Sequence, residues 1–224
     1  MNSIAKAITE LHSTLPEGVE LVAVSKFHPV ECLKQAYNAG QRAFGESRVQ
    51  ELCSKIPQMP ADTRWHFIGH LQTNKVKQLL AAGPLELIES VDSERLLSLI
   101  DAEACRLGIT VKVLMQVHVA REDTKFGFLP DELLAFFRQQ KYTALKATHI
   151  CGIMGMASNT DDTERIRADF HAIAALRRQI IDMCPDLRGF NTVSMGMSDD
   201  YPIAIDEGAT LVRVGTAIFG ERNY

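Results

Sequence analysis

Short apolar runs alternate with segments of helical periodicity along the whole chain. The runs lie at 21–25, 42–46, 65–69, 85–90, 111–119, 144–153, 190–194 and 210–215. Several are almost continuously apolar, as expected for parallel strands that are buried on both faces. Between Asp161 and Met183 the apolar residues recur on one broad helical stripe, preceded by the capping candidates Asn159 and Thr160. The pattern therefore predicts eight strands separated by helices.

Eight strand–helix alternations favour a closed (β/α)8 barrel, with an open doubly wound sheet as the second choice. No Gly/Ser linker, charge block or change of composition divides residues 1–224, so a single α/β domain is expected. Apolar residues at Ile4, Ala7, Ile8 and Leu11 predict an amphipathic N-terminal helix rather than a signal peptide. No apolar run approaches the roughly eighteen residues of a membrane span.

Composition and charge narrow the function classes. A net charge of -4 provides no broad basic surface, which argues against nucleic acid as a partner. A small anionic ligand is compatible with this net charge, because a local group of backbone N–H donors can bind it. The five cysteines are odd in number and form no C-x-x-C pair, so neither a disulfide framework nor a zinc site is expected. A reducing cytoplasmic location fits this cysteine usage.

Two predicted loops near the end of the chain together form a candidate anion site. Residues 194–200 begin with Ser194 and contain a glycine, and they follow the seventh predicted strand. Gly215 and Thr216 follow the eighth strand. In barrels of this class a phosphate site commonly forms from these two loops. Each loop alone has an ordinary interpretation as a helix cap or a turn, but their joint position favours phosphate binding.

Lys26 ends the first predicted strand, so its side chain is expected at the barrel mouth, where the active sites of such barrels lie. A lysine in an apolar site can have its pKa lowered from about 10.4 and then forms Schiff bases with carbonyl groups. Taken alone, a lysine at a strand end is most often an ordinary surface residue. Combined with the anion site, Lys26 predicts a phosphorylated aldehyde or ketone as the ligand.

Other polar residues give weaker signals. His66 and His70 are four residues apart, but the segment reads as a strand, where this spacing does not bring two metal ligands together. No metal site is therefore expected. The Asp199–Asp200 pair is assigned to a helix N-terminus rather than to acid–base catalysis. Asn74 opens a predicted helix, either on a solvated face or at the rim of the site.

Motifs distributed over nearly the whole chain carry a family resemblance. They lie at 22–26, 44–51, 65–69, 71–75, 125–127, 152–154, 194–200 and 212–220. With these motifs in this order, the chain resembles the YggS/PROSC family of pyridoxal phosphate homeostasis proteins. It departs from the usual family pattern at Ser47–Arg48, where Asn-Tyr is frequent, at His70, where proline is frequent, and at His118, where asparagine is frequent.

The resemblance implies the barrel of the alanine racemase N-terminal domain and pyridoxal 5'-phosphate (PLP) as the cofactor. Lys26 would be the lysine that forms the imine with PLP, and Arg213 would face the pyridine nitrogen. The residues implied as holding the phosphate are Ser194, Gly215 and Thr216. Three further residues are implied near the ring or the phosphate: His66, Asn74 and Met154.

The leading functional hypothesis is a PLP carrier that holds the cofactor and supplies it to apo-enzymes, with no catalytic residue of its own. An arginine beside the pyridine nitrogen weakens the ring as an electron sink, which disfavours carbanion chemistry. The second hypothesis is an amino-acid racemase; alanine racemase takes its second base, a tyrosine, from an additional C-terminal domain, and the sequence ends at Tyr224. A Schiff-base aldolase is the third. A monomer is expected.

Overall fold

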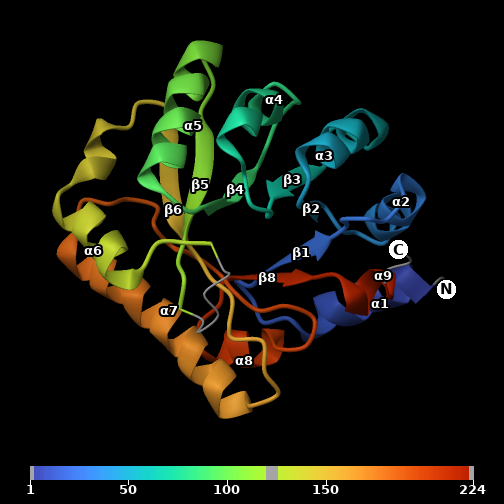
Figure 1. Ribbon diagram of the computed structural model, residues 1–224. Helices are drawn as coiled ribbons and strands as arrows, with labels where there is room; N and C mark the ends of the chain where they lie inside the picture. The colour runs from blue at the N-terminus through green and yellow to red at the C-terminus, as the bar shows by residue number, and fades with distance from the viewer. Residues whose placement is uncertain (1–2, 120–125, 222–224) are drawn as a thin grey trace.

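The computed structural model describes residues 3–119 and 126–221, in which eight parallel strands close into a barrel (Figure 1). Each strand pairs with the next, and β8 closes the ring against β1. The strands are β1 (Glu20–Val24), β2 (Ala43–Glu46), β3 (Arg64–Phe67), β4 (Leu87–Val91), β5 (Val111–Gln116), β6 (Thr148–Met154), β7 (Thr192–Ser194) and β8 (Leu211–Val214). The predicted barrel is confirmed, and the doubly wound alternative is wrong.

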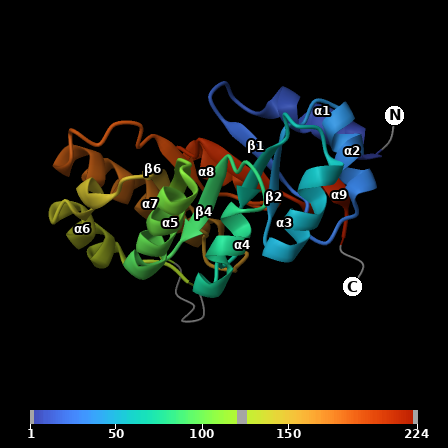
Figure 2. The same cartoon turned by 90° about the horizontal axis from the view of Figure 1, so that it is seen from above.

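Helices cover the outside of the barrel in both views (Figure 1, Figure 2). The α-helices are α1 (Ser3–Thr14), α2 (Val30–Asn38), α3 (Val49–Lys55), α4 (Val76–Leu80), α5 (Glu94–Leu107), α6 (Pro130–Arg138), α7 (Thr163–Met183), α8 (Tyr201–Asp206) and α9 (Thr216–Phe219). Three 3-10 helices are η1 (Ile56–Gln58), η2 (Thr73–Lys75) and η3 (Lys141–Ala144). The predicted amphipathic helix is α1, which buries Ile4, Ile8 and Leu11 and contacts α9.

Two local predictions were wrong. The strand expected at 144–153 begins at Thr148, because the preceding segment is held in another conformation by Asp101, whose carboxylate accepts the N–H groups of Lys146 and Ala147. The long helix α7 is capped by Asp162, which accepts the N–H groups of Glu164 and Arg165, and not by Asn159 or Thr160. A carboxylate in this position also interacts favourably with the positive end of the helix dipole.

The barrel interior changes from apolar to polar along the strands. One buried apolar cluster consists of Val22, Ala43, Leu87, Leu114, Met154 and Leu211. Side chains alternate between the two faces of a strand, so Glu89 lies on the same face as Leu87, and Arg213 on the same face as Leu211. Both charged residues are two positions closer to the C-terminal ends of their strands, and both are almost fully buried. The interior therefore becomes charged towards the C-terminal mouth.

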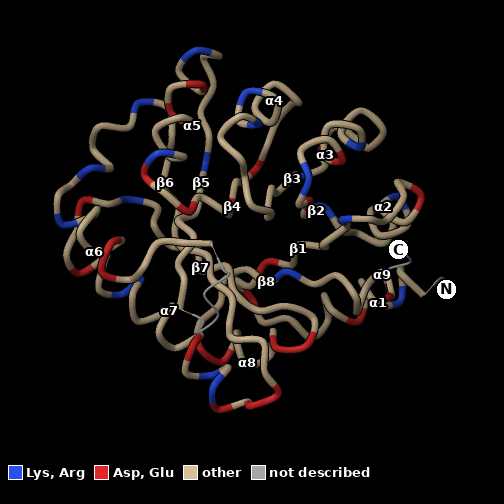
Figure 3. The backbone as a smooth tube through the Cα atoms, viewed as in Figure 1, with Lys and Arg blue, Asp and Glu red and all other residues tan. Residues whose placement is uncertain are grey.

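The helices on the outside of the barrel differ in length and carry charged residues of both signs. No helix within the described residues has the length and apolar character needed to span a bilayer. Lys and Arg are interspersed with Asp and Glu over the outer helices (Figure 3). The main core lies between strands and helices, with Phe44, Phe67, Phe137 and Phe170 among its fully buried side chains.

Candidate functional site

A cavity of about 240 Å³ lies at the C-terminal end of the barrel, beside the ends of β1 and β8. Four of the eight predicted site residues line it: Lys26, Arg213, Gly215 and Thr216. The remaining lining residues are Val24, Ile68, Met156, Met197, Ser198 and Asp199. The fold therefore brings the predicted lysine, the arginine and the glycine–threonine pair into one site.

Lys26 is half-buried and directly precedes a strained turn. Phe27 has a φ of 68°, in the left-handed region that residues other than glycine rarely adopt. Its N–H donates to Oε1 of Glu51 at 2.7 Å, and the guanidinium carbon of Arg48 lies 4.6 Å from the centre of its ring. Arg48, one of the departures from the family pattern, thus stabilises the turn that follows Lys26 through a cation–π contact.

A buried ion-pair network of Lys55, Glu46 and Glu51 supports this turn through hydrogen bonds. Lys55 is 4% exposed, and its ammonium donates to the carbonyl oxygen of Ser25 at 2.9 Å and to Oε1 of Glu46 and of Glu51, each at 2.7 Å. All three ammonium hydrogens are thereby used. The Ser25 hydroxyl also donates to Glu46 Oε1, at 2.6 Å. Burial raises the pKa of Glu46 to about 7, against the opposing charge and hydrogen bond of Lys55.

Two backbone N–H groups converge on one oxygen at the cavity. The N–H groups of Gly215 and Ala217 donate to Oγ of Ser198 at 3.2 and 3.5 Å. Donors that converge in this way are also arranged to hold an anion. A Cβ on Gly215 would lie 3.3 Å from Cβ and the carbonyl oxygen of Val24, so glycine permits the close approach to β1. Ser198 was missed by the sequence analysis, although it lies inside the motif at 194–200.

The loop that carries Ser198 is fixed by Asp200, which accepts the N–H of Met197 at 2.5 Å. Asp200 is the residue that flanks the start of α8, as predicted for the acidic pair, but its carboxylate bonds to the preceding loop and not to the helix. Burial raises the pKa of Asp200, with Arg213 among the groups that oppose this shift.

Arg213 forms one wall of the cavity and is held by a network inside the barrel. Its guanidinium donates from Nη1 to the hydroxyl of Ser194 and from Nη2 to the carbonyl oxygen of Gly155 at 3.1 Å. Ser194 in turn donates to Oε2 of Glu89 at 2.5 Å, which lies 3.7 Å from Arg213 Nη1. Nδ1 of His66 lies 2.7 Å from Oε1 of Glu89. Burial lowers the pKa of Arg213, although the charges of Glu89 and Asp200 oppose this.

The other four predicted residues do not line the cavity. Ser194 is fully buried beside Arg213, and His66 contacts the network through Glu89. Met154 belongs to the apolar cluster inside the barrel, and Asn74 is exposed in η2. Glu89 was missed by the sequence analysis, although an acid inside the apolar run 85–90 is a recognisable signal. The motif at 125–127 begins at Lys125, which lies outside the described residues.

Comparisons with known proteins agree with the fold and show the family. The family model for the alanine racemase N-terminal domain matches residues 1–223. The pyridoxal phosphate homeostasis protein of Schizosaccharomyces pombe is 40% identical over 208 residues, covering 92% of this chain and 85% of the yeast protein. That of Mus musculus is 36% identical over 230 residues, covering 99% of this chain and 82% of the mouse protein. The chain belongs to the pyridoxal phosphate homeostasis protein family.

Solved structures share the barrel of this chain. PipY from Synechococcus elongatus, solved without PLP, has a TM-score of 0.91 at 37% identity and covers 97% of this chain and 100% of its own. The structure of PipY with PLP bound has a TM-score of 0.89. Alanine racemase from E. faecalis, at 18% identity and a TM-score of 0.72, covers 98% of this chain but only 58% of the racemase. This last similarity shows the fold alone.

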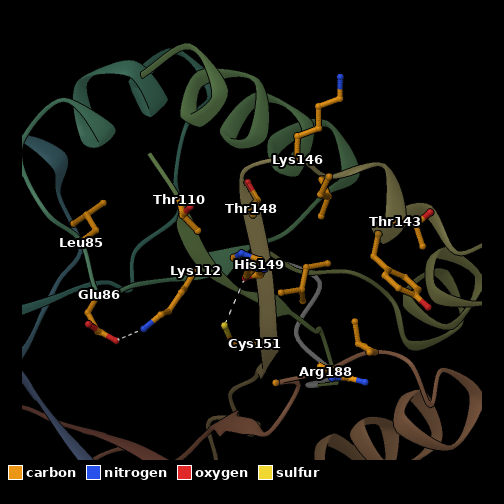
Figure 4. A pocket seen from close by; sticks show the side chains of 15 residues that line it. Leu85, Glu86, Thr110, Lys112, Thr143, Lys146, Thr148, His149, Cys151 and Arg188 are labelled. Carbon is orange, nitrogen blue, oxygen red and sulfur yellow. Dashed lines mark hydrogen bonds and ion pairs between the residues drawn. The ribbon is translucent and has the colours of Figure 1, made fainter. Parts of the chain in front are cut away.

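A larger cavity of about 560 Å³ lies at the opposite, N-terminal end of the barrel (Figure 4). None of the eight predicted site residues lines it. Lys112 is paired with Glu86 at 2.8 Å, and the side chain of Lys146 points away from the pocket (Figure 4). Active sites of these barrels lie at the C-terminal end, so the Lys26 cavity is the better candidate. Over residues 3–119 and 126–221, no three His, Cys, Asp or Glu side chains are grouped to hold a metal ion.

Proposed function

We propose that this chain binds PLP in the Lys26 cavity and acts as a carrier that supplies it to apo-enzymes. The observation that carries the proposal is that Lys26, Arg213, Gly215 and Thr216 line one cavity. A single site thus offers an amine for the aldehyde, backbone donors for the phosphate and a fixed guanidinium for the ring. Bound PLP supplies a reactive aldehyde and an aromatic ring that can accept electrons.

In this proposal Lys26 forms the covalent link. Its side-chain amine is the group that would hold the aldehyde of PLP, with loss of water. The Lys55 network would position this amine, because it fixes the turn in which Lys26 stands. Such a link is reversible by water or by an incoming amine, so PLP would be returned intact, as a carrier requires.

The phosphate is assigned to the two loops that meet at Ser198. The N–H groups of Gly215 and Ala217, with the hydroxyls of Ser198 and Thr216, are the donors that fit an anion here. Ser194, which the family resemblance implied as a phosphate ligand, is fully buried and does not line the cavity. We therefore assign Ser194 to the support of Arg213.

Peptide mapping after borohydride reduction tests the covalent link. Protein loaded with PLP is reduced, digested and examined by mass spectrometry, and a pyridoxyl group is expected on Lys26. Lys26→Ala should lose the visible imine band and retain part of its PLP through the phosphate donors. The matched control is Lys34→Ala, at an exposed lysine of α2, which should keep the band. Modification found only on another lysine would refute the assignment.

A transfer assay tests the carrier role. The loaded protein is mixed with an apo PLP-dependent enzyme and with a scavenger that consumes PLP in solution. Reactivation that persists under the scavenger, when an equal amount of unbound PLP gives none, supports direct supply. Reactivation that disappears with the scavenger would reduce the role to PLP storage.

A further inference from the structure

Four polar side chains form a closed hydrogen-bonded cluster in the barrel, next to the Lys26 cavity. They come from four strands: His66 from β3, Glu89 from β4, Ser194 from β7 and Arg213 from β8. None is more than 5% exposed. Only Arg213 also lines the cavity, so the other three act on a ligand through it.

The hydrogens of this cluster can be assigned from the chemistry of each group. Arg213 only donates, so the Ser194 oxygen accepts from it, and the Ser194 hydrogen goes to Oε2 of Glu89. Burial alone would raise the pKa of Glu89, but its interactions with His66, Arg213 and Ser194 together lower it. Glu89 accepts the Ser194 hydrogen and lies 3.7 Å from the guanidinium, which favours the carboxylate form, and a carboxylate accepts from Nδ1 of His66 at its Oε1. Nε2 of His66 is buried and has no hydrogen-bond partner within the described chain.

The cluster has a clear electrostatic consequence at the cavity. The positive charge of Arg213 is almost fully desolvated, and the anion of Glu89 lies 3.7 Å from its Nη1. The guanidinium of Arg213 therefore faces the cavity as a hydrogen-bond donor, while Glu89 balances its charge from inside the barrel. Without Glu89, the same guanidinium would lose its counter-ion inside the barrel and keep only the weaker compensation by Asp200, in a site of low dielectric constant.

We propose that Glu89 is a positioning residue that fixes Arg213 and balances its charge, so that the imine formed by Lys26 keeps its proton to a higher pH. This inference rests on the proposed function. A protonated imine is a cation, and an arginine whose charge is less well balanced would destabilise it. Beyond Lys26, the charged or titratable groups that the described residues place near the cavity, the Lys26 turn and the cluster are Glu46, Arg48, Glu51, Lys55, His66, Glu89, Asp199, Asp200 and Arg213.

The test is the pH midpoint of the visible imine band in PLP-loaded protein, which does not depend on any activity. Glu89→Gln keeps the shape and removes the charge, so its midpoint should fall by about one pH unit, the size expected for one charge several ångströms away at partial screening. Glu89→Asp retains the charge and should stay close to wild type. Glu86→Gln is the matched control, because it removes an exposed acid paired with Lys112 ahead of the same strand.

A second pair of variants keeps the test independent of whether Glu89→Gln folds. Arg213→Gln leaves the anion of Glu89 in place and should raise the midpoint. The double variant with Glu89→Gln and Arg213→Gln restores neutrality and should return the midpoint towards wild type. A folded Glu89→Gln with an unchanged midpoint, or shifts of the same sign in both single variants, would overturn the inference. Absence of an imine band in the wild type would instead refute the role of Lys26, and this inference with it.

Discussion

Replacement of Lys55 by methionine should destabilise the fold strongly, although Lys55 does not touch the cavity. Methionine preserves most of the side-chain length but removes all three hydrogen bonds of the ammonium. Glu46, which is fully buried, then loses its counter-ion, and the carbonyl oxygen of Ser25 loses a charged donor. Removal of one partner of a buried ion pair costs about 3 to 5 kcal/mol of unfolding free energy.

The pKa of Glu46 sets the pH dependence of this loss. Because burial already raises that pKa to about 7, the carboxyl group can take up a proton once Lys55 is absent. Protonation removes the uncompensated charge, so the penalty should be near 3 kcal/mol at pH 8. It should be about 1 kcal/mol smaller at pH 6, since one pKa unit corresponds to about 1.4 kcal/mol.

Urea unfolding followed by circular dichroism at pH 6 and pH 8 measures the loss of stability and its pH dependence. We expect a single transition because the strands of the described residues close one barrel. Lys34→Met, at an exposed lysine on α2, is the control and should change stability by less than about 0.5 kcal/mol. A loss below about 1 kcal/mol at pH 8 in Lys55→Met, or the same loss at both pH values, would show that the network does not carry the stability assigned to it.

Further predictions follow from single contacts. Pyridoxal without its phosphate should bind at least about tenfold more weakly than PLP in fluorescence titrations, because charge-assisted hydrogen bonds are worth about 1.5 to 3 kcal/mol each; equal affinities would exclude the phosphate site. The folded-state pKa of Glu46 lies above the ordinary value of 4.5, so wild type should lose stability as pH rises from about 5 to 7, by up to about 1.4 kcal/mol per unit, and Glu46→Gln should lose this slope in urea midpoints. Gly152→Ala would place a Cβ 1.8 Å from the carbonyl oxygen of Thr192 and should cost about 3 kcal/mol or more, whereas Gly40→Ala, whose Cβ meets no atom within 4 Å, should cost clearly less in the same assay. Incubation with L-alanine should give no more D-alanine, by chiral chromatography, than unbound PLP does, because Arg213, placed at the ring as proposed, would disfavour protonation of the pyridine nitrogen; turnover at ordinary enzymatic rates would contradict the carrier function.

The sequence predicted the fold well because the strand signal is strong in a parallel barrel. Strands buried on both faces are continuous apolar runs, and all eight were found by this pattern. Their ends were less accurate. The start of β6 depends on Asp101, which lies 45 residues before Lys146 in the chain, and no local pattern carries that information.

The candidate site was predictable in part, for a related reason. Lys26, Arg213, Gly215 and Thr216 lie at the C-terminal ends of strands, and this position alone brings them together in a barrel. Ser194 and Ser198 are four residues apart in one motif, and only the geometry shows that Ser194 is bonded inside the barrel while Ser198 lines the cavity. The sequence shows which residues of this motif carry a hydroxyl group. Which of these hydroxyl groups faces the cavity depends on their positions along the strand and the loop.

Two buried charge networks adjoin the cavity, one around Lys55 behind the turn at Lys26 and one around Glu89 inside the barrel. Stability alone does not account for either, because well-packed apolar residues in place of a buried ion pair are often as stable or more so. Each network instead fixes one group that faces the cavity. Lys55 and its two acids hold the Lys26 turn, while Glu89 and Ser194 hold Arg213. The amine and the guanidinium are thus positioned before any ligand arrives, which lowers the ordering cost of binding.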